Sequence, residues 1–153
     1  MNHIQKIVDS LNTLLVRSHD AVEGYDEAHK RIENEQISQL FEQIARTRLQ
    51  YSRTLHQEIV NLGGSPEADT STKGDLHRTW MKIKDLFTSS DEKAILEECI
   101  RGEEQTLADY EEVLSDTSLA PSLFKAIDSQ KRMVENDVER LKRLRAAFAV
   151  ATN

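Results

Sequence analysis

The feature that most constrains this chain is one carboxylate in the middle of an apolar helical stripe. Between residues 96 and 114, apolar side chains recur every three or four positions, as on a helix with one buried face. At about 100° per residue, the centre of that stripe falls on Glu103. A buried carboxylate is costly unless something pairs with it, so the fold must supply a partner for Glu103. The stripe consists of Leu96, Cys99 or Ile100, Leu107, Tyr110 and Leu114.

The rest of the composition favours an all-α protein. The chain has 153 residues, enough for one domain with a sizeable core, and we expect residues 1–153 to form a single domain. Only five Gly and two Pro are present, so long uninterrupted elements are possible. Charged residues make up 31% and aromatic residues 5%, as expected of a helical bundle with solvated faces.

Charge and hydropathy exclude several classes of partner. The net charge of −7 argues against sequence-independent nucleic-acid binding, which needs clustered Lys and Arg. No run of 18 or more apolar residues is present, and the N-terminus reads as polar and amphipathic rather than as a signal peptide. Cys99 is the single cysteine; it permits no intrachain disulfide, and its place on the apolar side of a helix is typical of an inert core thiol. We expect a cytoplasmic protein that binds neither membrane nor nucleic acid.

The hydrophobic periodicity predicts four long helices and one short one. Asn2 and Asn34 are suitable N-caps for the first two, and Gly63-Gly64 ends the second. Because the connection between these two helices is short, they must pack antiparallel. The predicted ranges are about 2–31, 35–62, 75–88, 90–115 and 119–149.

The short helix lies within a long crossover. Residues 63–75 form the one loop-like segment of any length, and Ser89 with Glu92 has the capping-box pattern for the next long helix. Trp80 is expected to anchor the short helix on the bundle, with a partner or oligomer contact as the alternative. Its apolar face consists of Leu76, Trp80, Ile83 and Phe87. Short connections on either side of one long crossover give an up-down-down-up bundle, the connectivity of ferritin-like proteins.

Polar residues interrupt the other apolar stripes as well. Ser18 lies in the stripe of the first helix, Arg48 on the core side of the second, one turn before Tyr51, and Lys131 in the apolar face of the last. Arg48 can pair with Glu103, or it can extend from the edge of the face with only its stem buried. Acidic residues interleave with Lys and Arg in the last helix, which we interpret as a salt-bridged surface. These acidic residues are Glu135, Asp137 and Glu139.

With this topology the chain resembles ferritin-like di-iron proteins of the rubrerythrin type. In those proteins the first and third long helices carry Gly-Glu with Tyr seven residues after the Glu, and the other two carry Glu-x-x-His. Here Gly102-Glu103 and Tyr110 match the third helix, while Tyr25 keeps the register of the first. Phe41 and Phe124 keep the aromatic positions of the second and fourth long helices. The ligand positions differ: they hold Ser18, Arg48-x-x-Tyr51 and Lys131-x-x-Val134, and Thr106 fills a position that some of these proteins give to a carboxylate.

The resemblance extends over nearly the whole chain to an uncharacterised bacterial four-helix-bundle family of the ferritin-like superfamily. Its local features here are Leu62-Gly63-Gly64, Leu76-His77-x-x-Trp80 and Glu97-Glu98-Cys99-x-Arg101-Gly102-Glu103. The resemblance implies a former di-metal position at which one Glu survives and two ligand positions have become positive. We expect a buried polar cluster there, without metal or other cofactor, that consists of Ser18, Arg48, Tyr51, Glu103 and Lys131.

Three functions are compatible with this pattern. The leading one is a non-catalytic bundle, not an enzyme, that has a structural, regulatory or stress-associated role through a protein partner or homo-oligomer. The second is a metal-dependent oxidoreductase or metal store with an unconventional site. The third is binding of a small polar ligand between Arg48 and Glu103, which requires a cavity.

Overall fold

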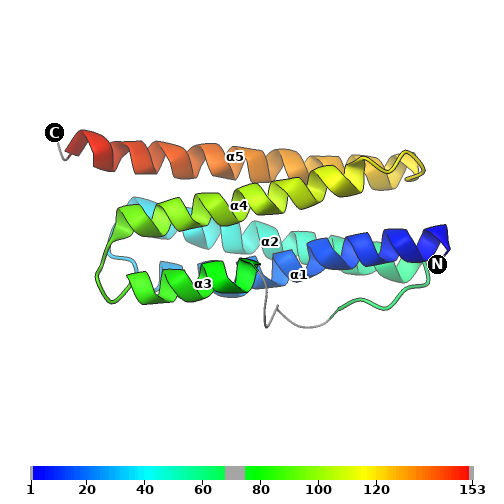
Figure 1. Ribbon diagram of the computed structural model, residues 1–153, viewed down its shortest axis with the longest axis horizontal. Coiled ribbons are helices and arrows are strands. Elements are labelled where there is room, and N and C mark those ends of the chain that lie inside the picture. Colours follow the sequence, from blue (N-terminus) through cyan, green and yellow to red (C-terminus); the bar gives the residue numbers. More distant parts are fainter. Residues whose placement is uncertain (1, 68–74, 152–153) are drawn as a thin grey trace.

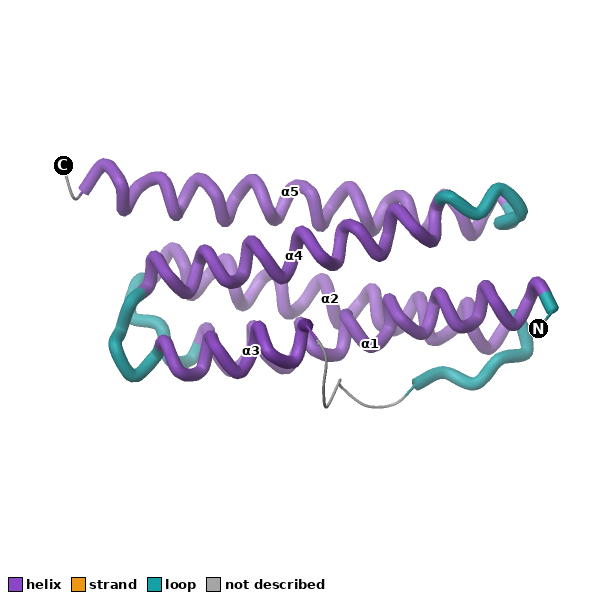
Figure 2. Tube along the Cα trace, viewed as in Figure 1, coloured by secondary structure: helices purple, strands orange, loops and turns teal. Residues whose placement is uncertain are grey.

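The computed structural model describes residues 2–67 and 75–151, and within them every regular element is a helix (Figure 2). Both ends of each helix lie within a few residues of the ends that its periodicity predicts. The helices are α1 (His3–His29), α2 (Glu35–Asn61), α3 (Asp75–Leu86), α4 (Glu92–Leu114) and α5 (Pro121–Ala151). None of these is both long and apolar enough to cross a membrane.

The four long helices form two antiparallel hairpins, α1–α2 and α4–α5, which pack side by side (Figure 1). Helix α3, between the two hairpins in sequence, packs against α1 and α4. Helices α2 and α4 therefore run in the same direction, and the predicted up-down-down-up bundle with an extra short helix is confirmed.

Local capping explains where the helices start and stop. The side chains of Asn2 and Asn34 accept hydrogen bonds from the backbone N–H of Gln5 and Ile37, at 2.8 and 3.1 Å. Gly63 has a positive φ of 82°, and the next N–H bonds back to the carbonyl of Ile59, so α2 ends in a left-handed turn as predicted.

The predicted cap of α4 at Ser89 is wrong. The Ser89 hydroxyl donates to the Leu86 carbonyl and completes the last turn of α3. The chain then reverses through Ser90, at φ 54°, and Asp91 caps α4 by accepting from the backbone N–H of Ala94 at 3.0 Å. The tight reversal between α3 and α4 thus moves the cap two residues along the chain.

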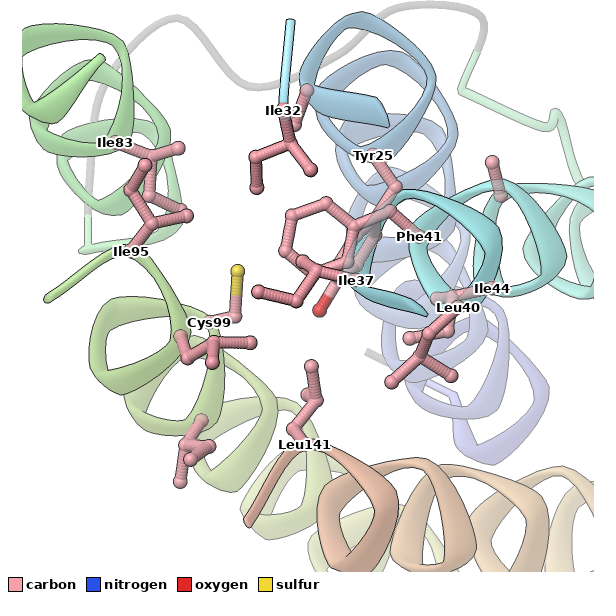
Figure 3. Packing of buried hydrophobic residues seen from close by; sticks show 14 of the residues in the cluster. Tyr25, Ile32, Ile37, Leu40, Phe41, Ile44, Ile83, Ile95, Cys99 and Leu141 are labelled. Carbon is pink, nitrogen blue, oxygen red and sulfur yellow. The ribbon is translucent and has the colours of Figure 1, made fainter. Parts of the chain in front are cut away.

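The core consists of two hydrophobic clusters, one toward each end of the bundle. The first is formed by the C-terminal half of α1, the N-terminal halves of α2 and α4, the end of α5, and Ile83 of α3. Figure 3 shows its side chains, including Tyr25, Phe41 and Cys99, directed into the space between the helices. The second is formed by the opposite ends of the same long helices. Residues 48, 103 and 137 lie between the two clusters, so the bundle has a polar layer near its middle.

Helix α3 and the residue that follows it pack on the first cluster. Ile83 is buried, and Trp80, Leu86 and Phe87 are partly buried. The Trp80 ring lies across Gly24 and contacts the edge of Tyr25, with ring centroids 4.9 Å apart. The predicted contribution of Leu76 falls on a side chain outside the described residues. The close approach at Gly24 allows α3 to lie directly on the backbone of α1.

We expect Gly24→Ala to destabilise the protein, although alanine is the better helix former by about 1 kcal/mol. An added Cβ would lie 2.4 Å from ring atoms of Trp80, so the ring and α3 must move. Overpacking of this kind typically costs about 1–3 kcal/mol. Urea unfolding measures the change.

The double variant Gly24→Ala, Trp80→Ala provides the control for this prediction. Without the indole ring the added methyl group has space, so Gly24→Ala should then be neutral or stabilising relative to Trp80→Ala alone. A Gly24→Ala protein more stable than the wild type would show that Trp80 does not rest on α1 in solution.

Candidate functional site

The polar layer is centred on Arg48 of α2, whose side chain is only 2% exposed. It lies one turn beyond Ile44 and seven residues before Leu55, both of which are buried. Arg48 therefore occupies a core position of the helix, and its guanidinium points into the bundle rather than extending to solvent. The alternative of a half-buried Arg48 at the edge of its face is wrong.

Two carboxylates from two other helices bind the Arg48 guanidinium. Glu103 of α4 accepts two bonds, with Nη1 3.0 Å from Oε1 and Nη2 bonded to Oε2. Asp137 of α5 accepts a third, with Nη2 3.2 Å from Oδ2. This geometry connects α2, α4 and α5 at one level of the bundle and combines a bidentate charge-assisted pair with a second acceptor.

Asp137 also lies beside a second cation, which is partly exposed. One guanidinium faces two carboxylates, and the nearest other cation to Asp137 is the partly exposed Arg140, 3.7 Å away. Burial works to lower the pKa of Arg48, but the charge and hydrogen bonds of Glu103 outweigh it and raise that pKa. Burial raises the pKa of Asp137, against the attraction of Arg48 and with the added repulsion of Glu103. The permanent charge therefore lies on Arg48, and Asp137 is the group in the cluster that burial moves toward protonation.

Asp137 was missed by the sequence analysis, which assigned it to the surface. It is buried, three residues after Val134 and one before Val138, on the edge of the core stripe of α5. Gln130 is also buried and accepts a hydrogen bond from the Tyr110 hydroxyl at 2.8 Å. Both positions fit the three-and-four spacing of the stripe, and that spacing is the signal that identifies them.

Lys131 does not join the cluster, contrary to the sequence prediction. Its side chain is 23% exposed, and its nearest acidic partner is the exposed Glu111, at 3.9 Å. The register of the antiparallel α4–α5 hairpin explains this placement. Tyr110 faces Gln130, so Glu103, seven residues before Tyr110, is level with Asp137, seven residues after Gln130. Lys131 lies six residues from Asp137, which is about 9 Å along the helix axis.

The other two predicted members of the cluster, Ser18 and Tyr51, are not among the residues that hydrogen-bond to the ion pair in the described part of the chain, and two further buried groups, Tyr25 and Cys99, lie on neighbouring helices. Ser18 is buried, but its hydroxyl donates to the Leu14 carbonyl of its own helix. Tyr51 is partly buried beside Arg48, and burial raises its pKa. Tyr25 lies on the same buried side of α1, and burial raises its pKa well above the ordinary value. Cys99 is also buried, and burial raises the pKa of its thiol, so the thiolate is strongly disfavoured.

The residues present do not fit a di-metal centre. Such a centre requires several carboxylates and imidazoles free to bind two cations. Here Glu103 and Asp137 already accept hydrogen bonds from a guanidinium that stands between them. No group of three or more His, Cys, Asp or Glu in residues 2–67 and 75–151 is arranged to hold a metal ion.

The raised pKa of Asp137 predicts a specific pH dependence of stability. The folded protein retains the Asp137 proton at pH values where the unfolded chain, with a carboxyl pKa of about 4, has lost it. The contribution of Asp137 to the free energy of unfolding therefore falls as pH rises from about 4 through its folded-state pKa. Asp137→Asn keeps an oxygen acceptor for Arg48 and removes this titration. The variant should gain stability relative to the wild type across that pH window.

Urea unfolding of both proteins over this pH range measures the difference. Glu111→Gln is the matched control, because it removes the same charge at an exposed site of α4. If the advantage of Asp137→Asn shrank as pH rose, the Asp137 pKa would be lowered and not raised.

The fold is similar to that of solved ferritin-like proteins. A ferritin-like, diiron-carboxylate protein from Bacillus anthracis str. Ames superposes with a TM-score of 0.77 at 19% identity, over 94% of this chain and 99% of the other. The bacterioferritin-related protein from Bacteroides fragilis, described as a dodecameric thioferritin, has a TM-score of 0.71 at 17% identity, over 97% and 90% of the two chains. At this identity the likeness concerns the fold alone.

Sequence comparison identifies the family. No curated protein matches the chain. A family model described as a domain of unknown function (DUF2383) matches residues 6–116, a span that contains Arg48, Glu103 and the whole crossover. The chain is therefore a member of the DUF2383 family, with a ferritin-like fold.

Proposed function

We propose that this protein is a non-catalytic ferritin-like bundle in which the Arg48 ion pair takes the structural place of a di-metal centre. The observation that carries this proposal is the guanidinium bonded to carboxylates from α4 and α5. A metal centre fixes helices through bonds to several of them, and the ion pair does the same with an organic cation. The core is then a structural element, and the functional groups of the protein lie on its surface.

Two features support a role through protein contacts. The bundle fold is that of a protein described as dodecameric, so assembly of identical chains is compatible with this architecture. Large apolar side chains are exposed on several helices, among them Met81, Phe124 and Met133. We propose a structural or regulatory role, stress-associated in the bacterial cytoplasm, as a homo-oligomer or with another protein.

The alternatives receive less support. A metal-dependent oxidoreductase or metal store requires ligands that the Arg48 cluster does not leave free. A small polar ligand requires space near Glu103, and the cavity that Glu103 lines has a volume of about 10 Å³. This volume accommodates one water molecule and excludes metabolites.

Metal analysis is the direct test. Protein purified without a metal-affinity step should contain iron, manganese and zinc well below one equivalent per chain, and chelator treatment should leave its melting temperature unchanged. A metal bound to the folded state stabilises it by mass action, so its removal would lower the melting temperature. Stoichiometric metal that is lost on Glu103→Leu would establish the metalloprotein instead.

A mutant cycle tests whether Arg48 and Glu103 act as a pair. Arg48→Leu strands two buried carboxylates and should destabilise the protein by about 3–5 kcal/mol. Glu103→Leu should cost less, because Arg48 keeps its bond to Asp137. The double variant should recover much of the loss, and further Asp137→Asn should recover more, since no buried charge then remains unpaired.

Lys131→Met is the matched control for this cycle. It removes a cation from the same region of the bundle, but from a partly exposed side chain with an exposed partner, so it should change stability by less than about 1 kcal/mol. The pairing of Arg48 with Glu103 would be contradicted if the losses of unfolding free energy in Arg48→Leu and Glu103→Leu simply added in the double variant. It would also be contradicted if Lys131→Met lost as much stability as Arg48→Leu.

A further inference from the structure

A second polar feature lies next to Glu103, on the side of the bundle that α3 covers. A small cavity of about 10 Å³ lies among α1, α3 and α4. Tyr25, Trp80, Cys99, Glu103 and Thr106 are among the residues that line it. Three helices thus contribute polar side chains to one small cavity.

Two hydrogen-bond donors on residues that line this cavity lack a protein hydrogen bond of full geometry. They are the buried Tyr25 hydroxyl, which interacts with the Cys99 thiol, and the buried Trp80 indole Nε1. An unpaired buried donor typically costs about 1–3 kcal/mol, and such groups in native proteins are usually satisfied by internal water. Because both side chains line the same cavity, one acceptor there would serve both donors.

We propose that this cavity is a binding site for one internal water molecule that connects α3 to the ion-pair layer. A water molecule accepts two hydrogen bonds, which matches the donors of Tyr25 and Trp80. It also donates two, and the Glu103 carboxylate has lone pairs left beside those that Arg48 occupies. The Thr106 hydroxyl, which donates to the Gly102 carbonyl, still has acceptor capacity as well.

The size and chemistry of the cavity exclude other occupants. A water molecule requires roughly 10–15 Å³ and two to four polar partners, and this cavity meets both conditions. A metal ion is disfavoured because two of the lining groups are donors. The site shares Glu103 with the Arg48 ion pair, but its occupancy by water does not depend on the proposed non-catalytic role, and the Tyr25 and Trp80 donors report on it separately.

Trp80 covers the site on the side of α3. The same side chain also lines a groove of about 120 Å³ between α1 and α3. A water molecule held by several polar groups behind Trp80 should reside much longer than a surface water.

The sequence contains one tryptophan, so the Trp80 indole proton gives a single, unambiguous NMR signal. A water–protein nuclear Overhauser experiment on the full chain should show a cross-peak from this proton to water, with the sign of a long-lived bound molecule. A crystal structure should show one density peak within about 2.6–3.2 Å of both Tyr25 Oη and Trp80 Nε1. Tyr25→Phe should abolish the peak and the cross-peak.

Tyr110→Phe is the matched control, because it removes a buried hydroxyl that already bonds to Gln130. It should leave the density peak and the cross-peak unchanged. The inference is overturned by an empty cavity, by xenon uptake at that place, or by a Tyr25 hydroxyl that bonds to the Cys99 thiol in place of a water molecule. A water retained in full in Tyr25→Phe would equally overturn it.

Discussion

The arrangement of the bundle depends on the buried guanidinium of Arg48 in α2, which carboxylates of α4 and α5 bind. Moving Arg48, Glu103 and Asp137 out of water carries a desolvation penalty of several kcal/mol per ion, which only good geometry and additional hydrogen bonds offset. The Arg48–Glu103 contact is bidentate, and Asp137 adds the third bond. Once this cluster is formed, removing Arg48 leaves two buried carboxylates without their cation, whereas the loss of either carboxylate leaves Arg48 paired with the other. The surrounding helices are therefore constrained to one arrangement.

That constraint is chiefly one of register. Apolar stripes on two helices can slide by a turn and still bury most of their area, because their contacts are not directional. A slide of one turn moves a side chain by about 5.4 Å, which breaks a 3.2 Å bond such as that from Arg48 to Asp137. The Tyr110–Gln130 bond, two turns along the α4–α5 seam, repeats the same register. We infer that the polar layer contributes more to specifying the arrangement of α2, α4 and α5 than to stability itself.

The sequence predicts the fold and half of the site for identifiable physical reasons. Helical periodicity and capping residues are local, so the five helices and the partner positions of Glu103 and Arg48 follow from the chain itself. The choice between Lys131 and Asp137 is not local, because it depends on how α5 is set against α4. Charge balance favours Lys131, because a second cation beside Glu103 would be attracted to it. The structure instead places a second carboxylate there, and burial raises the pKa of that carboxyl group, Asp137. The position of Asp137 between Val134 and Val138 was the available signal.

An arginine and a pair of metal ions differ in what they allow a protein core to do. A metal can exchange its ligands, change its charge or leave, and each of these changes alters how the helices are held. Arg48 can do none of these, because Glu103 raises its pKa and so holds its positive charge in place. Burial raises the pKa of Asp137, which lies at the seam between α5 and α2 and can change its charge. Proton binding there alters one of the three bonds of the cluster and leaves the bidentate pair intact. The Arg48 cluster thus joins α2, α4 and α5 through a fixed positive charge, and Asp137 makes the α5 contact of that cluster sensitive to pH.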